Sequence, residues 1–208
     1  MIIFDLDGTL WDTTDATEKA AKDVVVTVSE IDNFDINVVK KGMGFTFEEN
    51  SKNYFPYLCQ KKREEYLKEI NNKTIEIIKS KGANLYDGLF GTIKMLSKYF
   101  RLAIVTNNSD EYVKTFFKIS NLEKYFVDYI GAFSYSITKA EAIKIIVSRN
   151  GNENNCYVGD TQNDMLAAME ANVEFVHARY GFQRNFDYKY YINNISELYD
   201  LIINKKIM

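Results

Sequence analysis

The chain has 208 residues, of which 46% are hydrophobic and 26% charged, a composition typical of globular proteins and not of disordered or fibrous ones. This length fits one large domain, or a domain with a small insertion, and excludes a multi-domain assembly. Twenty-six basic and 29 acidic residues give a net charge of −3 without a basic tract, so we expect no nucleic-acid partner.

The sequence carries no pattern for membrane insertion or export. No window approaches the roughly 20 apolar residues of a membrane span, and residues 1–5 lack the positive charge and cleavage site of a signal peptide. We therefore predict a cytoplasmic protein with no membrane partner. The two cysteines, Cys59 and Cys156, lie far apart, which indicates neither a disulfide framework nor a zinc site.

Five short apolar runs, rich in β-branched or aromatic residues and bounded by polar turns, predict β-strands. In chain order they are residues 2–6, 102–105, 127–132, 156–158 and 173–176. Apolar residues at three- and four-residue spacing predict helices that separate the later strands, at residues 109–120, 139–149 and 161–171. Strands that alternate with helices pair in parallel, so the predicted fold class is α/β.

The segment between the first two strands, roughly residues 15–84, shows helical periodicity almost throughout and no convincing strand. We interpret it as an inserted helical domain, with residues 1–14 and 85–208 forming the α/β domain. The alternating charges at the start of residues 61–81 predict a solvated helix face. Pro56, the only proline, is expected at a junction between two helices.

Polar and acidic residues follow three of the predicted strands. Ligands of an open parallel sheet bind beyond the carboxyl ends of its strands, where the strand order reverses. The residues there are 5–9 (DLDGT) after the first strand, 106–109 (TNNS) after the second and 159–164 (GDTQND) after the fourth. If these strands are neighbours, a hydroxyl and several backbone N–H groups converge with the carboxylates of Asp5, Asp7, Asp160 and Asp164.

Four carboxylates at one place predict a bound cation, because like charges within a few ångströms of each other cannot all stay ionised. Oxygen ligands alone favour a hard ion. Mg²⁺ fits best, since it takes near-octahedral oxygen coordination and is commonly shared between a protein carboxylate and a substrate phosphate.

The same residues are suited to phosphoryl transfer. Asp5 and Asp7 are two positions apart, so in an extended chain their side chains leave the same face and act on one substrate. One carboxylate can attack phosphorus while the other gives a proton to the leaving oxygen and later takes one from water. Thr106 and the N–H groups beside it, including that of Asn107, are suited to hold phosphoryl oxygens. Lys139 supplies a fixed positive charge for the transition state.

Four motifs occur in order along nearly the whole chain: FDLDGTL at residues 4–10, IVTN at 104–107, Lys139, and VGDTQND at 158–164. With a cap-sized insertion after the first strand, the sequence resembles the haloacid dehalogenase-like superfamily of aspartate-nucleophile phosphatases, in particular its phosphoglycolate phosphatase and β-phosphoglucomutase branch. The resemblance implies a Rossmann-like three-layer fold. It also implies a sheet order of 5-4-1-2-3 among the five predicted strands, and a small α-helical cap formed by the insertion.

The resemblance further implies a role for each matching residue. Asp5 would form an aspartyl-phosphate, and Asp7 would act as the acid and base. Mg²⁺ would be bound by Asp5, by the main-chain carbonyl of Asp7 and by Asp160, with Asp164 in support. In the insertion, Lys41 is either a substrate contact or a solvated lysine.

The sequence thus predicts a Mg²⁺-dependent phosphatase that hydrolyses a phosphomonoester of a small metabolite, either phosphoglycolate-like or a sugar phosphate. Asp7 excludes the dehalogenase members, which lack an acid at that position. One alternative is a β-phosphoglucomutase-like phosphomutase, disfavoured because residues 41–45 (KGMGF) lack the arginine of the mutase cap pattern. Another is a regulator that binds a phosphate ligand without turnover.

Overall fold

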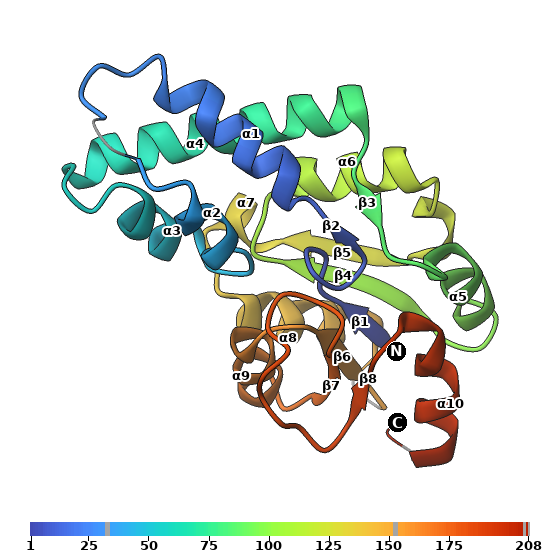
Figure 1. Cartoon of the computed structure of the whole chain (residues 1–208). Coiled ribbons are helices and arrows are strands. Elements are labelled where there is room, and N and C mark those ends of the chain that lie inside the picture. Colours follow the sequence, from blue (N-terminus) through green and yellow to red (C-terminus); the bar gives the residue numbers. More distant parts are fainter. Residues whose placement is uncertain (32–33, 152–153, 206, 208) are drawn as a thin grey trace.

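The computed structural model describes residues 1–31, 34–151, 154–205 and 207 of the chain. Its centre is a parallel sheet whose strands lie in the order β5-β4-β1-β6-β7-β8 (Figure 1). The strands are β1 (Ile2–Phe4), β4 (Leu102–Thr106), β5 (Asp128–Gly131), β6 (Cys156–Gly159), β7 (Glu174–Ala178) and β8 (Tyr191–Ile192). The five predicted strands lie in the predicted order, and β8 adds one more beyond β7.

Helices cover both faces of the sheet, which is why its strands are apolar on both sides. In β1 the side chains alternate, so that Ile2 and Phe4 pack into one apolar cluster and Ile3 into another. The first cluster also contains side chains of α5 (Leu89–Leu96), α6 (Asp110–Ser120) and α10 (Leu198–Lys205). The second contains side chains of α8 (Lys139–Asn150) and α9 (Gln162–Glu170). The predicted three-layer α/β fold is confirmed.

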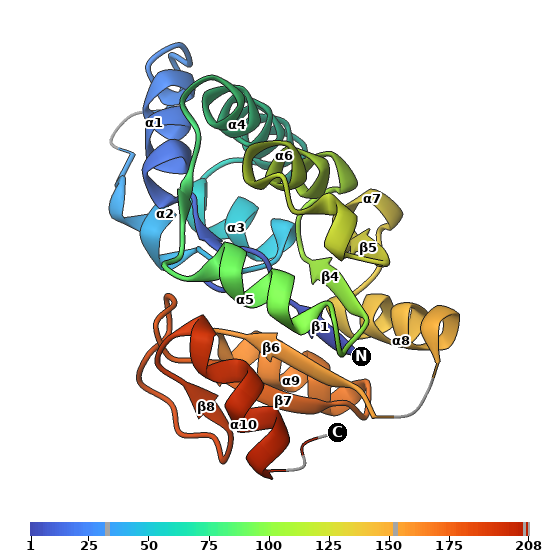
Figure 2. The ribbon, with the colours of Figure 1, turned by 90° about the vertical axis from the view of Figure 1, so that its right-hand side faces the viewer.

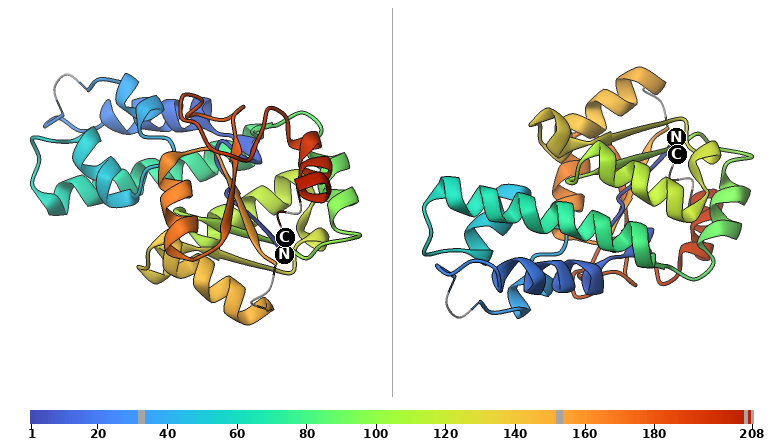
Figure 3. Two further views of the ribbon diagram at one scale, coloured as in Figure 1. Left: turned by 90° about the horizontal axis from the view of Figure 1, so that it is seen from below. Right: turned by 90° about the horizontal axis from the view of Figure 1, so that it is seen from above.

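The described residues of the segment for which helical periodicity was predicted contain four helices: α1 (Thr14–Val25), α2 (Asn37–Lys41), α3 (Phe47–Tyr54) and α4 (Gln60–Lys81). This helical part lies at one end of the sheet, and α1 and α4 run side by side in it (Figures 2 and 3). It has an apolar cluster of its own, which includes Val24 of α1 and Ile70 of α4. The domain boundaries at residues 15 and 84 stay a prediction.

Two short strands join the helical part to the rest of the chain. β2 (Trp11–Asp12) and β3 (Asn84–Leu85) pair antiparallel, so the chain enters and leaves the helical part side by side. The fully buried Trp11 ring packs edge-on against Tyr112 and Phe116 of α6, with centroid distances of 5.2 Å. The sequence did not predict these strands, because two residues are too few to show alternation.

Smaller features of the helical part agree with the sequence. Pro56 lies between α3 and α4, as expected for a helix junction. On α4, charged residues of the predicted solvated face, such as Lys61, Glu65 and Lys68, are exposed. No helix in the described ranges combines the length and apolar content needed to cross a membrane.

The remaining elements are short and lie in the α/β part of the chain. They are α7 (Ala132–Tyr135) and two 3₁₀ turns, Glu123–Tyr125 and Ile195–Glu197.

Truncation of Ile3 should destabilise the fold. Ile3 is fully buried between the sheet and its helices, so Ile3→Ala removes apolar contacts and leaves a cavity, at a cost of about 2–5 kcal/mol. Ile203→Ala is the matched control, because Ile203 on α10 is 53% exposed and its truncation should change stability by less than about 0.5 kcal/mol. Urea unfolding measures both variants, and equal losses would contradict this assignment of the core.

Candidate active site

The loop after β1 carries the first two predicted site residues. Asp5 continues the line of β1, and its N–H donates to the carbonyl of Val158 in β6 at 2.8 Å. The chain then turns at Gly8, whose φ of +80° is a conformation that residues with a side chain rarely adopt. A Cβ atom on Gly8 would also lie 2.2 Å from Oδ2 of Asp160. Gly8 therefore lets the Asp160 carboxylate approach the backbone of this loop.

Three of the four predicted aspartates form one buried carboxylate cluster. One carboxylate oxygen each of Asp5, Asp160 and Asp164 lies within 4.8 Å of the others. Nζ of Lys139, the first residue of α8, lies 2.8 Å from Oδ1 of Asp5 and 2.6 Å from Oδ1 of Asp164. Lys139 is buried as well. A single lysine charge thus faces three carboxylates that have little access to water.

The loop before α9 fixes Asp164. Thr161 caps this helix and forms a reciprocal capping box with Asp164. Oδ2 of Asp164 accepts hydrogen bonds from Oγ1 of Thr161 at 2.7 Å and from its N–H at 3.0 Å. Oδ1 accepts from Lys139, and the hydroxyl of Tyr157, a buried residue of β6 that was not predicted from the sequence, lies 3.4 Å from it while donating to the carbonyl of Val105 at 2.9 Å. Asp164 therefore orders the loop and orients the lysine.

Burial makes the carboxylate cluster costly to ionise. Burial first, and then the charge of Asp164, raise the pKa of Asp5 to about 7, although Lys139 opposes the shift. The pKa of Asp160 is raised well above its usual value by burial and by the charges of Asp164 and Asp5. Burial opposes the charged form of Lys139, but attraction to Asp164 and Asp5 more than offsets it and raises its pKa. The lysine stays charged, but its single charge does not offset three carboxylates when all of them are ionised.

The cluster fits a divalent cation. Oδ2 of Asp160 accepts the N–H of Phe182 at 2.6 Å. Its Oδ1 is buried and has no hydrogen-bond partner among the described residues, which is costly unless a ligand satisfies it. The atoms near it are carboxylate oxygens, which are the ligands of hard cations. Asp160 thus offers a free, buried oxygen at the place where an ion would offset the excess negative charge.

The side chain of Asp7 does not join the carboxylate cluster, contrary to the expectation that four carboxylates meet. Its Oδ1 accepts hydrogen bonds from Tyr112 at 2.7 Å and Thr13 at 2.8 Å, and its Oδ2 accepts one from Asn108 at 2.9 Å. The hydroxyls of Tyr112 and Thr13 are also 2.8 Å apart. Burial raises the pKa of Asp7, and these three donors oppose the shift. These three hydrogen bonds hold the side chain of Asp7 apart from the carboxylate cluster.

None of the three hydrogen-bond partners of Asp7 was predicted from the sequence. Asn108 could have been predicted, because it directly follows Thr106 and Asn107 at the end of β4. Tyr112 carries no such signal, since an aromatic residue in a helical pattern is usually a core residue. Thr13 precedes α1, where a threonine is ordinarily taken for a helix cap.

Thr106 and Asn107 lie where β4 ends. Thr106 is buried, and its Oγ1 accepts the N–H of Asn108 at 3.3 Å. Nδ2 of Asn107 donates to the carbonyl of Gly44, in the loop between α2 and α3, at 3.3 Å. On Gly44 a Cβ atom would lie 2.7 Å from Cγ2 of Thr161. This loop of the helical part therefore rests directly on two loops of the sheet.

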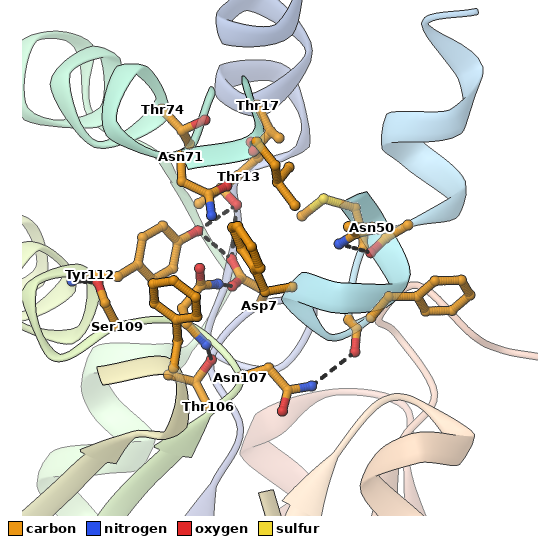
Figure 4. A pocket seen from close by; sticks show the side chains of 18 of the residues that line it. Asp7, Thr13, Thr17, Asn50, Asn71, Thr74, Thr106, Asn107, Ser109 and Tyr112 are labelled. Carbon is orange, nitrogen blue, oxygen red and sulfur yellow. Dashed lines mark hydrogen bonds between the residues drawn. The ribbon is translucent and has the colours of Figure 1, made fainter. Parts of the chain in front are cut away.

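A cavity of about 350 Å³ lies between the helical part and the ends of the strands (Figure 4). Five predicted site residues line it: Asp5, Asp7, Thr106, Asn107 and Lys139.

The other three predicted site residues do not line the cavity. Asp160 and Asp164 lie close to the carboxylate of Asp5, which does line the cavity. Lys41 is exposed at the end of α2, and the structure does not bring it to the other site residues.

The chain is similar to known hydrolases over most of its length. Residues 2–178 match the model of the haloacid dehalogenase-like hydrolase family. A phosphoglycolate phosphatase of Aquifex aeolicus (strain VF5) is 28% identical over 193 residues, which cover 88% of this chain and 85% of that protein. A solved haloacid dehalogenase-like hydrolase from Streptococcus pneumoniae has a TM-score of 0.81 at 22% identity, over 96% of both chains. A predicted phosphoglycolate phosphatase from Haemophilus somnus has a TM-score of 0.79 at 21% identity, over 97% of this chain and 96% of that one.

The chain therefore belongs to the haloacid dehalogenase-like hydrolase family. The family recognised from the sequence is confirmed, and so is the predicted enzyme class, a phosphatase of this family.

Removal of divalent ions should make the stability of the fold depend on pH. The pKa values of Asp5 and Asp160 are higher in the folded than in the unfolded chain, so their protonation stabilises the metal-free fold at low pH. For Asp5 this contribution is lost as the pH rises from about 4 to about 7. We expect the melting temperature in EDTA to fall over this range, and to fall much less with Mg²⁺, which binds the ionised carboxylates. Parallel curves with and without Mg²⁺ would contradict a metal site at this cluster.

Proposed function

We propose that this chain is a Mg²⁺-dependent phosphatase of a small phosphomonoester, and that Asp5 carries the phosphoryl group during turnover. The observation that supports this most directly is the setting of Asp5. Its carboxylate opens onto the cavity, and Lys139 holds its Oδ1 at 2.8 Å. Within the described part of the chain its Oδ2 accepts no hydrogen bond, so one oriented oxygen is available to attack phosphorus.

In the first step, an oxygen of Asp5 attacks phosphorus and the bond between phosphorus and the ester oxygen breaks. Asp7 gives its proton to the departing oxygen. Burial favours the protonated form of Asp7, which suits it to this role as general acid. In the second step, the Asp7 carboxylate takes a proton from a water molecule, whose oxygen attacks phosphorus. The bond between phosphorus and Asp5 breaks, and inorganic phosphate leaves.

The remaining residues hold the phosphoryl group and the ion. The hydroxyl of Thr106, the backbone N–H of Asn107 and Nζ of Lys139 are suited to bind the phosphoryl oxygens. Asp5, the main-chain carbonyl of Asp7 and Asp160 would hold Mg²⁺, with Asp164 in support. When bound, Mg²⁺ supplies positive charge that offsets the charges of Asp5 and the phosphoryl group. We assign no role in this reaction to Lys41.

We propose that residues 15–84 act as a cap over residues 1–14 and 85–208. The hydrogen bond from Asn107 to Gly44 supports this, as does the contact between the rings of Phe47 and Phe133, whose centroids are 4.7 Å apart. A closed cap excludes water until the ester is bound, and its opening admits the hydrolytic water. The paired strands β2 and β3, which carry both chain crossings, are the natural hinge.

The substrate is a small phosphorylated metabolite in this proposal. The relative from Aquifex aeolicus is named for phosphoglycolate, which supports a substrate of that size. A phosphomutase is not favoured, because no arginine for a second phosphate is found among the described residues that line the cavity. The cytoplasmic location stays the expectation from the sequence.

Asp5→Asn should abolish Mg²⁺-dependent release of phosphate from p-nitrophenyl phosphate, by a factor of about 10³ or more, because an amide is not a nucleophile. EDTA should have the same effect on the native protein. Asp15→Asn is the control, because Asp15 is exposed on α1 and does not line the cavity. Undiminished turnover by the Asp5 variant would contradict the proposed nucleophile.

Tyr112→Phe should impair the acid step through Asp7, which Tyr112 positions. We expect kcat/KM to fall by about tenfold for an alkyl phosphate but much less for p-nitrophenyl phosphate, whose leaving group departs without a proton. Tyr135→Phe is the control, because Tyr135 is exposed and bonds to Asp110. An equal loss on both substrates would show that Tyr112 only supports the fold.

A further inference from the structure

The wall of the cavity opposite the catalytic residues is polar but nearly uncharged. Apart from Asp5, Asp7 and Lys139, the ionisable carboxylate and ammonium groups among the described residues that line the whole cavity are those of Lys68 on α4 and Glu111 on α6. The other polar side chains that α1, α3 and α4 contribute to the cavity are amides and hydroxyls: Thr17, Asn50, Tyr54, Asn71, Asn72 and Thr74. Such groups can both donate a hydrogen bond to a ligand hydroxyl and accept one from it, but they offer no charge to pair with an anion.

Asn71 is the member of this wall that faces the reacting groups. It lies on α4 and is partly buried, and Figure 4 shows its amide pointing toward Thr13, Tyr112 and Asp7. The hydroxyls of Thr17 and Thr74 donate to backbone carbonyls, at 3.1 Å and 2.9 Å. The Asn71 amide, by contrast, makes no hydrogen bond to any part of the chain that the structure describes. It therefore presents both a free donor and a free acceptor beside the general acid.

The two remaining charged side chains of the cavity, Lys68 and Glu111, are poorly placed to hold a second anionic group. Lys68 is exposed, one turn of α4 before Asn71, while Ile75 on the other side of Asn71 packs into the core. Lys68 therefore lies toward the outside, where water screens its charge. Glu111 is also exposed and forms an ion pair with Lys79 at 2.8 Å. A carboxylate on the leaving group would lose its hydration next to Asn71 without gaining a buried cation.

We propose that this cavity selects the phosphate ester of a small, uncharged polyhydroxy alcohol, and that Asn71 binds the hydroxyl next to the ester oxygen. The proposal rests on the function proposed above and narrows its substrate class. An amide can donate to one lone pair of such a hydroxyl and accept its proton, so a leaving group without the hydroxyl leaves Asn71 unsatisfied. The cavity volume of about 350 Å³ is at the small end of the range for ligand sites, which suits an alcohol of a few carbons.

The test compares three esters of similar size on the native protein with Mg²⁺: glycerol 1-phosphate, n-propyl phosphate and phosphoglycolate. We expect kcat/KM for glycerol 1-phosphate to exceed that for the other two by roughly tenfold or more. In Asn71→Ala this preference should largely disappear. It should persist in the matched control Asn53→Ala, because Asn53 is exposed on α3 and lies outside the cavity lining.

Two results would overturn the proposal: equal use of glycerol and propyl phosphates, or a preference for phosphoglycolate over glycerol 1-phosphate, which its loss in Lys68→Ala would assign to that lysine. The native comparison decides the substrate class even if Asn71→Ala does not fold. p-Nitrophenyl phosphate separates this failure from that of the proposed function. A protein that hydrolyses it without preferring glycerol 1-phosphate remains a phosphatase with a different selectivity, whereas one that hydrolyses none of the four esters is not the proposed phosphatase.

Discussion

The buried lysine between two aspartates is the interaction on which the rest of the site depends. Nζ of Lys139 bonds to Asp5, which directly follows β1, and to Asp164 in the first turn of α9, the helix that follows the neighbouring strand β6. A buried ion pair is stable only when its geometry is good and its remaining hydrogen-bonding atoms are satisfied. Asp164 meets this condition through Thr161, but Asp160 adds a third carboxylate with an unpaired oxygen. This imbalance is compatible with a divalent cation bound at the cluster.

The sheet makes this crowding of carboxylates feasible. In the parallel register Phe4 lies opposite Ile104 and Val158, so the residues that follow in each strand emerge at the same edge from distant points of the sequence. Glycines then allow the side chains to approach the backbone closely. At Gly8 and Gly181, a Cβ atom would lie within 2.5 Å of an oxygen of Asp160. A larger residue at either glycine would keep the Asp160 carboxylate away from the backbone. The glycines therefore allow the carboxylates to lie close together in spite of their mutual repulsion.

The sequence predicted what depends on local pattern. Strands buried on both faces are continuous apolar runs, and the polar residues that follow them include Asp5 and Asp160, whose carboxylates the structure brings together. The sequence did not predict features that depend on contacts between distant parts of the chain. Strands β2, β3 and β8 are too short to show a period. The partners of Asp7 come from the start of α1 and from the first turn of α6, so no spacing in the sequence relates Thr13 to Tyr112. Lys41 was singled out from its neighbours in the sequence, but α2 leaves its side chain exposed.

Calorimetric titration of Mg²⁺ into the protein, in buffers of different ionisation enthalpy, shows whether Asp5, Asp160 and Asp164 form a metal site. We expect one ion per chain, with protons released near neutral pH because the pKa of Asp5 is raised to about 7 in the metal-free protein. Binding should be lost in Asp160→Asn. Absence of binding, or binding that releases no protons and survives that substitution, would contradict a metal site built on these buried carboxylates.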